Sequence, residues 1–509
     1  MVGDALMFTA AILVLNGSRV KGVLQLRKSW KFFEETKKKF DPIRDKLHPE
    51  LVNCMDFGVG FFLFALSIIP SKYLRFAQIA GFRADREEGL RAIRNTYESG
   101  RLRRPLATAV LLFNGILVPR GISDVSALLE EATGICDRAI EQYPEGSAWR
   151  VMAAQAAKKR LDLEAAKEHY RVCLETCRAA AGSAPTLIAY EYASVHVMLL
   201  DFDKAIELLE PIMKEPPFKM YTICAAQLAG CYISKGETEK AVSLWKDIIS
   251  RFGKSSSATV SSIVKLFENY VISGGLFTTF EILYFRRDLS KMTSLDERLL
   301  TILDELAKKA GIIDAATGSL VPARASTKLS ENVPSAAKEE KKKGFTFKSF
   351  KESVKSVVKK DTANFDFTND NRASYMLMKA AILKTLKGTD DKEAIGLLED
   401  VTKMQGALIG KWFLPYAYYE LCESYSKLGD FNKATEALKK CISFKDYPWE
   451  DPLKVRIRVT TDQIKAISKA DITDDDGGSL EASSEPSSEA GDDDSSDAPP
   501  PPRPPKPSK

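Results

Sequence analysis

The feature that most constrains this chain is a helical pattern that recurs at near-regular intervals along the sequence. When the copies are aligned on one alanine, the first four follow one another at spacings of 34, 39 and 36, and two further copies come after a gap. The aligned residues are Ala132, Ala166, Ala205, Ala241, Ala394 and Ala434. A period of about 34 residues with two helices per unit is typical of tetratricopeptide repeats. The chain is therefore predicted to be an all-α, tetratricopeptide-like helical-repeat solenoid.

The clearest copy surrounds Ala241. Leu228 and Tyr232 are four positions apart, so they share one face of a first helix. Ala241 is small enough for the second helix to approach closely, and Trp245 is predicted to fill the groove between units. One copy would be weak support, but two clear copies and four partial ones in one chain favour repeats over a generic helical bundle.

Apolar residues elsewhere recur at spacings of three and four, which is typical of helices rather than strands. Helices are expected over most of 1–312 and 373–468. The run Ser294-Leu295-Asp296-Glu297 resembles a capping box and predicts a helix start with Ser294 as the cap.

Composition divides the chain into four segments. Residues 1–316 are predicted to form an N-terminal helical region with repeats, and 373–470 a C-terminal repeat pair. Between them, 317–372 is rich in Ser, Thr, Lys and Asn without steady periodicity, so a basic flexible insertion is expected. Residues 471–509 are acidic and then proline-rich, so a disordered tail is expected.

Charge is uneven along the chain. The formal net charge is +5, and residues 471–509 contribute eleven acids and three bases, or −8, which leaves +13 for the rest. This asymmetry is compatible with an acidic partner, an anionic membrane surface, contact between tail and body, or solvation alone. Eight scattered cysteines without a CxxC pair fit a reducing compartment. The longest apolar stretches, 57–69 and 106–118, fall short of the roughly 20 residues of a membrane span, so no such span is predicted.

Three consecutive segments carry a family resemblance: DFGVGFFLFALSIIP at 56–70, LRFAQIAGF at 74–82 and DREEGL at 85–90. With Arg104-Pro105-Leu106 and the repeats at 205–245 and 418–438, they resemble the tetratricopeptide repeat protein 39 family, which also includes the fungal inclusion body clearance protein. The resemblance covers residues 5–468. Family members usually have further helices before the position of Ala5, so a shortened isoform or gene model, or a reduced N-terminal cap, is expected here.

The resemblance implies an α-helical fold without known catalytic activity. It also implies a cytosolic protein, associated in fungi with mitochondrial outer membrane or lipid-droplet surroundings and in animals with adaptor-like roles.

Catalytic and metal-binding motifs are scarce in the sequence. The three histidines, His48, His169 and His196, have no metal-ligand spacing, and neither a phosphate-binding loop nor a G-x-S-x-G elbow occurs. His196 is predicted to be a packing residue, and Gly58 and Gly60 are predicted to let two helices pack closely. We therefore expect no enzyme activity, no cofactor, no metal and no nucleic-acid partner.

Protein binding is the expected activity, because tetratricopeptide solenoids usually bind extended peptides along their first helices. The Lys and Asn pair that clamps a C-terminal carboxylate is missing from the corresponding positions, which disfavours a chaperone-tail adaptor. Tyr190, Tyr416 and Tyr419 instead predict an aromatic peptide-binding face, with core packing as the alternative for about half of such tyrosines.

Two segments outside the repeats are candidate contacts. Phe347, Phe350, Lys351 and Lys355 follow a basic amphipathic pattern within the insertion, which predicts contact with an anionic membrane or a partner groove, or else a solvated linker. Pro501, Pro504 and Lys506 match a reverse-orientation SH3-domain ligand, a short motif that also arises by chance.

The leading hypothesis is a non-enzymatic cytoplasmic scaffold or adaptor that mediates protein–protein interactions. The alternative is a peripheral factor at lipid droplets or the mitochondrial outer membrane, acting in inclusion clearance or lipid handling.

Overall fold

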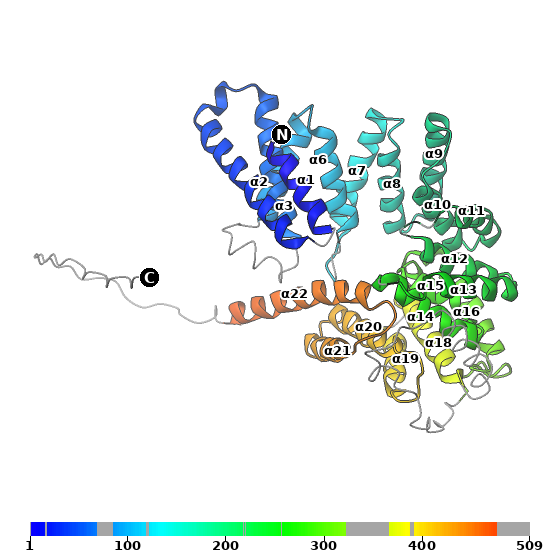
Figure 1. Cartoon of the computed structure of the whole chain (residues 1–509). Helices are drawn as coiled ribbons and strands as arrows, with labels where there is room; N and C mark the ends of the chain where they lie inside the picture. The colour runs from blue at the N-terminus through cyan, green and yellow to red at the C-terminus, as the bar shows by residue number, and fades with distance from the viewer. Residues whose placement is uncertain are drawn as a thin grey trace, which may run out of the picture. The chain divides into compact units, whose positions relative to one another are not determined.

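The computed structural model describes residues 2–15, 18–68, 85–118, 122–216, 218, 220–255, 257–321, 366–386 and 391–475. Helices dominate these residues, and their only β-structure is an isolated bridge between Ile313 and Leu320 (Figure 1). The all-α prediction is therefore confirmed. The chain divides into two compact units, Met1–Gln463 and Ile464–Lys509.

The N-terminal part is a series of helix pairs. Helices α1 and α2 form a hairpin, α3 packs on α5, and α5 packs on α6 (Figure 1). The bounds are α1 (Val2–Leu15), α2 (Arg19–Phe40), η1 (Asp41–Lys46), α3 (Pro49–Ser67), α5 (Arg86–Ser99), α6 (Arg104–Leu112) and the π-helical turn η2 (Phe113–Leu117).

Two glycines bring α3 and α5 into backbone contact. A Cβ added at Gly60 would lie 2.8 Å from the carbonyl oxygen of Gly89, and one added at Gly89 would lie 2.7 Å from that of Gly60. No side chain fits there without moving a backbone, which explains Gly60 and Gly89. A Cβ at Gly58 would instead collide with the ring of Phe33 on α2, so both glycines of α3 let helices pack closely, as predicted. Asp85 caps α5 by accepting a hydrogen bond from the Glu88 amide at 2.9 Å.

Helix α3 is longer than the sequence pattern indicated. It begins at Pro49 and spans 19 residues, so by length and composition it is the one helix among the described residues that could cross a membrane. Of its apolar window, 56% is buried inside the protein, where it packs on α2 and α5. A core helix of a soluble protein meets the same criterion.

The repeats follow as alternating first and second helices, each packed on the next. Four full pairs are α8 with α9, α10 with α11, α12 with α13 and α20 with α21, and α18 with α19 is a fifth. The bounds are α7 (Ser126–Gln142), α8 (Ser147–Lys159), α9 (Leu163–Ala181), α10 (Thr186–Met198), α11 (Phe202–Lys214), α12 (Tyr221–Ser234), α13 (Thr238–Phe252), α18 (Thr368–Leu383), α19 (Asp391–Lys403), α20 (Phe413–Lys427) and α21 (Phe431–Ser443).

The aligned alanines occupy one structural position in five of the six copies. Each lies three positions after the first residue of a second helix and is buried, and the five are Ala166, Ala205, Ala241, Ala394 and Ala434. Ala132 lies later in its helix, α7, and is also buried. Trp245 is fully buried and packs against Phe267 and Tyr270 of α14. The repeat seen in the sequence therefore corresponds to a buried position that recurs in the second helix of each pair.

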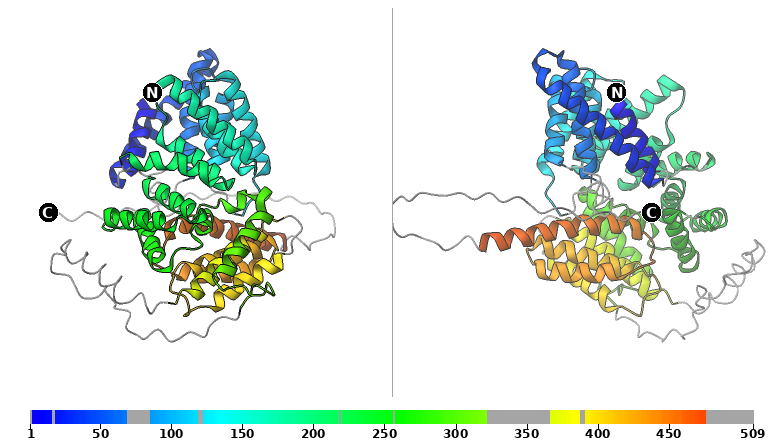
Figure 2. Two further views of the ribbon diagram at one scale, coloured as in Figure 1. Left: turned by 90° about the vertical axis from the view of Figure 1, so that its right-hand side faces the viewer. Right: turned by 60° about the vertical axis from the view of Figure 1, so that its left-hand side comes forward.

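The remaining elements join the segments before and after the insertion. They are α14 (Ala258–Ser273), α15 (Thr278–Phe285), η3 (Leu289–Lys291), η4 (Thr293–Leu295), α16 (Asp296–Lys309) and α22 (Glu450–Asp475). Helix α18 packs on both α15 and α16, so the chain up to Gln463 is one compact unit across the insertion (Figure 2). The predicted cap at Ser294 is wrong, because Leu295 precedes the first turn of α16 and makes no side-chain cap.

Candidate functional site

The first helices of the repeats are where a peptide-binding groove was expected, and α15 covers part of this first-helix face. Helix α15 packs on α12, and every residue of α15 is buried. On α12 the residues from Tyr221 to Tyr232 are all buried as well. The chain therefore fills the face of its own α12 with one of its own helices.

A small residue on α12 permits this close contact. A Cβ added at Gly230 would lie 3.3 Å from the Cα of Thr279 in α15. The Thr279 hydroxyl donates to the Gly230 carbonyl at 2.7 Å and lies 2.7 Å from the Ser234 hydroxyl. A Cβ at this distance would be in tighter contact than usual, so this close approach of the two helices favours a residue without a side chain.

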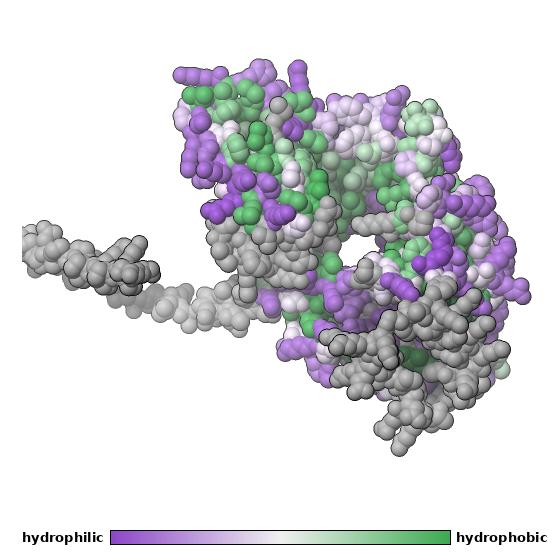
Figure 3. Space-filling view, viewed as in Figure 1, coloured by the Kyte–Doolittle hydropathy of each residue, from purple (hydrophilic) through white to green (hydrophobic). Residues whose placement is uncertain are grey.

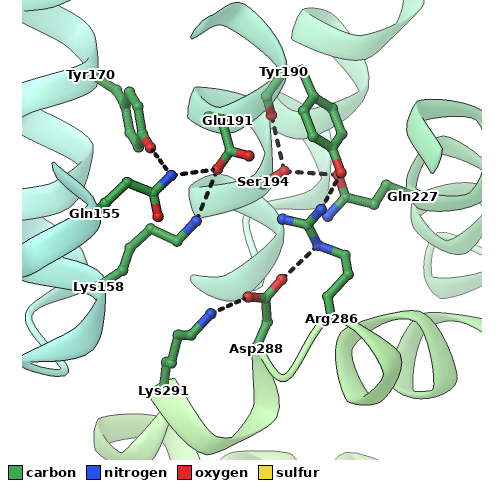
Figure 4. Close-up of polar contacts among 10 residues, drawn as sticks. All are labelled: Gln155, Lys158, Tyr170, Tyr190, Glu191, Ser194, Gln227, Arg286, Asp288 and Lys291. Carbon is green, nitrogen blue, oxygen red and sulfur yellow. Dashed lines mark hydrogen bonds and ion pairs between the residues drawn. The ribbon is translucent and has the colours of Figure 1, made fainter. Parts of the chain in front are cut away.

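Beside α15, a polar cluster joins α8, α9 and α10 (Figure 4). The Lys158 ammonium donates to the Glu191 carboxylate at 2.9 Å, and its side chain is only 4% exposed. The Gln155 amide donates to the Tyr170 hydroxyl at 2.8 Å and to Glu191 at 3.2 Å. Glu191 thus receives hydrogen bonds from two residues of the preceding first helix.

The segment after α15 completes this cluster from the other side (Figure 4). Asp288 accepts from Arg286 at 2.7 Å and from Lys291 at 2.8 Å, and its side chain is 1% exposed. Arg286 also donates to the hydroxyl of Tyr190. Together these contacts attach the 286–291 segment to the first helix α10.

Charge pairing decides the ionisation of the two acids. Burial would raise the pKa of Glu191, but the charges of Lys158 and Arg286 hold the pKa below its ordinary value. Burial likewise opposes ionisation of Asp288, and Lys291 and Arg286 hold its pKa far below the ordinary value. Both carboxylates are therefore ionised at neutral pH, and each of the five charges has an opposite charge beside it. Such a cluster fixes the relative positions of helices.

A second charged cluster lies at the C-terminal cap of α18 and on α20, and Arg287 reaches it. Arg287 donates to Glu423 at 2.9 Å, and Lys384 donates to Glu420 at 2.6 Å. Arg287 has a φ of 56°, a left-handed conformation that costs a side-chain-bearing residue roughly 1–2 kcal/mol. Two adjacent arginines, Arg286 and Arg287, thereby join the repeats before the insertion to those after it.

The three predicted binding tyrosines lie in the core, so the prediction that they form an exposed face is wrong. Tyr190 is fully buried against Arg286. Tyr416 is fully buried and donates to the Trp449 carbonyl at 3.0 Å. The hydroxyl of Tyr419 lies 3.1 Å from that of Thr460, and Tyr419 is buried too. Their hydroxyls serve packing against later parts of the chain, because Arg286 follows α15, Trp449 directly precedes α22 and Thr460 lies on α22.

Of the other predicted residues, His196 lies in the core, and those of the insertion and the tail lie outside the residues that the structure describes. His196 is buried, with its Nδ1 2.9 Å from Asp201, the cap of α11. The insertion residues Phe347, Phe350, Lys351 and Lys355 and the tail residues Pro501, Pro504 and Lys506 lie outside the described residues. In the described part of the chain, no group of three or more His, Cys, Asp or Glu residues could hold a metal ion.

Sequence reasoning missed Arg286, Arg287 and Asp288. The available signal was a charged triplet directly after the apolar run 282–285. Its partners are up to 136 residues away in the chain, so no local pattern could identify them.

Comparison with known proteins gives one family match and several distant ones. Residues 1–268 match the model of the family described as Iml2/Tetratricopeptide repeat protein 39. The Caenorhabditis elegans tetratricopeptide repeat protein ttc-39B is 25% identical over 166 residues, which cover 31% of this chain and 29% of the worm protein. The match therefore spans less than a third of that relative.

Three solved structures resemble the chain at low similarity. A human IFIT1 dimer with m7Gppp-AAAA is 12% identical, with a TM-score of 0.31, and the match covers 87% of this chain and 90% of that one. Naa15/Naa10 bound to HypK-THB is 13% identical, with a TM-score of 0.30, and the match covers 93% of this chain and 70% of that one. Yeast Tom70 is 11% identical, with a TM-score of 0.21, and the match covers 94% of this chain and 99% of that one. The family match covers more than half of the sequence. This chain therefore belongs to the Iml2/tetratricopeptide repeat protein 39 family.

Proposed function

We propose that this protein is a non-enzymatic helical-repeat scaffold or adaptor that binds other proteins in the cytoplasm. The observation that carries the proposal is the coupling of the helix pairs into one unit by α15 and by the two arginines that follow it, Arg286 and Arg287. Stacked repeats coupled in this way present extended, fixed surfaces, which is how solenoid proteins bind partners. Because α15 covers α12, partners are expected on faces outside the α12–α15 contact.

The ionisable groups support the same proposal. Lys158 of α8 pairs with Glu191 of α10, and Arg286, which follows α15, donates to Tyr190 of α10, so these groups are used to hold helices together. Asp288 pairs with Arg286 and Lys291 of its own segment. A catalytic acid or base would need to reach a substrate.

Proximity labelling with the full chain, followed by two-step affinity isolation, tests the proposal. A scaffold should enrich at least two proteins over a labelling-enzyme control, and isolating one of them through the scaffold should co-isolate the other. If no protein is enriched, or if each is found only in separate complexes, the scaffold proposal fails.

A second candidate function, peripheral association with the mitochondrial outer membrane or lipid droplets, is favoured by the α1–α2 hairpin. Phe8 and Ile12 of α1 are about half exposed and lie four positions apart, on one face of the helix. Helix α2 and the turn after it, residues 19–46, carry ten basic and four acidic residues, a net of +6. Figure 3 shows hydrophobic residues reaching the surface among these N-terminal helices. An exposed apolar face on α1, which packs on the basic helix α2, fits an anionic membrane surface, where each near-surface lysine contributes about 1 kcal/mol.

Flotation of the full chain with vesicles tests this second function. Recovery should be greater with acidic than with neutral vesicles and should fall in high salt. The double variant Phe8→Asp/Ile12→Asp should lose recovery, whereas Leu428→Asp, at a similarly exposed leucine on the α20–α21 turn, should keep it. Deleting 338–360 tests the contribution of the insertion in the same assay. Equal recovery with both vesicle types would exclude this function.

A further inference from the structure

A cavity of about 310 Å³ lies among α5, α6 and α7, on helices distinct from the covered first-helix face. Helix α5 contributes Tyr97 and Glu98 to its lining, α6 contributes Arg104, and the end of α7 contributes Arg138 and Gln142, followed by Tyr143. Two guanidinium groups thus line one concave surface. Pockets that hold small ligands usually have volumes of about 300–1,000 Å³, so this cavity is at the lower end of that range.

Arg138 is held in place by Tyr97. Its Nε donates to the Tyr97 hydroxyl at 2.8 Å, and the guanidinium carbon lies 5.9 Å from the centre of the Tyr97 ring. These contacts use one face and one edge of the guanidinium. Within the described residues Arg138 has no carboxylate partner, so its two terminal nitrogens keep their hydrogen-bonding capacity.

Arg104 is held by the backbone of α5. Its Nη2 donates to the Glu98 carbonyl at 2.8 Å, and its Nε is buried without an acceptor among the described residues. A buried Nε is closed to a ligand in the cavity, so the terminal nitrogens of Arg104 are the groups that a ligand oxygen could contact. The Nε of Arg103 is buried without an acceptor as well, but Arg103 pairs with the Asp4 carboxylate at 2.9 Å, and Arg94 pairs with Glu131 at 3.0 Å. The described residues give Arg104 no such carboxylate partner.

The lining has the chemistry of an anion site with an apolar wall. Glu98 is the one carboxylate among the lining residues, against two guanidinium groups. The rings of Tyr97 and Tyr143 stand beside those groups, and Tyr143 contacts Trp149 at a ring distance of 6.4 Å. Guanidinium groups bind phosphate through two parallel hydrogen bonds each, and a phosphate monoester offers three oxygens and up to two charges.

We propose that Arg104 and Arg138 bind a phosphorylated side chain of a partner protein, with the ester's organic part against Tyr97 and Tyr143. An aryl phosphate, as in phosphotyrosine, matches both the guanidinium pair and the aromatic walls. The inference deepens the proposed scaffold function by naming a chemical class of partner, and it rests on that function.

Calorimetric titration of the full chain at low ionic strength tests the proposal. The probe is N-acetyl-phosphotyrosine amide, with N-acetyl-tyrosine amide as the uncharged comparison. Only the phosphorylated probe should bind. Arg104→Gln and Arg138→Gln should each weaken binding by about tenfold or more. The matched control is Arg101→Gln, which removes the same charge from an exposed position outside the cavity and should bind normally.

Circular dichroism of the variants separates lost binding from lost folding, and Arg138→Gln changes an exposed side chain that need not affect the fold. Absence of binding to the natural chain, or equal weakening by Arg101→Gln, would overturn the proposal. So would arginine-dependent binding to phosphatidic-acid vesicles without binding to the phosphotyrosine probe, because the ligand would then be a lipid headgroup. A failed titration leaves the scaffold function standing if proximity labelling still finds co-isolated partners.

Discussion

Glu281 is a carboxyl group enclosed between helices from the two sides of the insertion, and replacing it with glutamine should stabilise the protein at neutral pH. Its two carboxyl oxygens accept hydrogen bonds from the Tyr270 hydroxyl on α14 and the Ser374 hydroxyl on α18. The residue is 5% exposed. Burial raises its pKa from 4.5 to about 7, the charge of Asp370 adds to the rise, and the two hydrogen bonds oppose it.

The size and sign of the effect follow from that pKa. Raising the pKa from 4.5 to about 7 corresponds to about 3 kcal/mol, at about 1.36 kcal/mol for each pH unit. Between these pH values the folded chain holds a proton that the unfolded chain has released. The free energy of unfolding therefore falls as pH rises from about 4.5 to 7, and the full loss remains above pH 7. Glutamine imitates the protonated acid and carries no such loss.

Denaturant unfolding of the natural chain and of Glu281→Gln at pH 5 and pH 8 measures the difference. The variant should be nearly as stable as the natural chain at pH 5 and about 3 kcal/mol more stable at pH 8. Glu305→Gln changes an exposed acid on α16 and should have little effect at either pH. A destabilised Glu281→Gln variant at pH 8, or an equal effect at both pH values, would refute the argument that burial raises the pKa of Glu281.

Three further changes test the packing of the repeats. Gly230→Leu should lower the free energy of unfolding by about 1–3 kcal/mol, because the leucine side chain would meet α15 at Thr279. Gly396→Leu on α19 adds a side chain where no atom lies within 4 Å of the Cβ position, so it should not lower stability in this way. Equal thermal midpoints for the two variants would contradict the contact. Asp430→Ala removes the cap that accepts from the Lys433 amide at 3.0 Å and should cost about 1 kcal/mol in denaturant unfolding. Glu191→Gln leaves the buried Lys158 ammonium without its counter-charge and should lower the free energy of unfolding by about 3 kcal/mol. The double variant Lys158→Met/Glu191→Leu should regain much of this loss of stability. If it regains none, the charge pair is not the cause of the loss.

Much of the fold was predictable because its signals are local. The alanine spacing and the apolar periodicity act within a single repeat unit, and they predicted the helix pairs and the packing position of Ala241. The glycines of segments 56–70 and 85–90 were also readable, although only the structure shows that Gly60 and Gly89 face each other.

The candidate site was predicted poorly, because burial of a tyrosine on a first helix depends on distant parts of the chain. Tyr190 is covered through Arg286, 96 residues later, and Tyr416 through Trp449. A repeat pattern marks which side of a helix packs inside its own unit, but it carries no information on a later helix that packs on the other side.

The sequence by itself therefore determined the helical-repeat class, the family and the positions of the repeat units, since these depend on contacts between near neighbours in the chain. The tertiary structure alone decided that α15 fills the face of α12, that Arg286 and Arg287 join the repeats across the insertion, and that Arg104 and Arg138 share a cavity. Each of these depends on where separate helices meet, which burial and charge pairing fix only when the whole unit has folded.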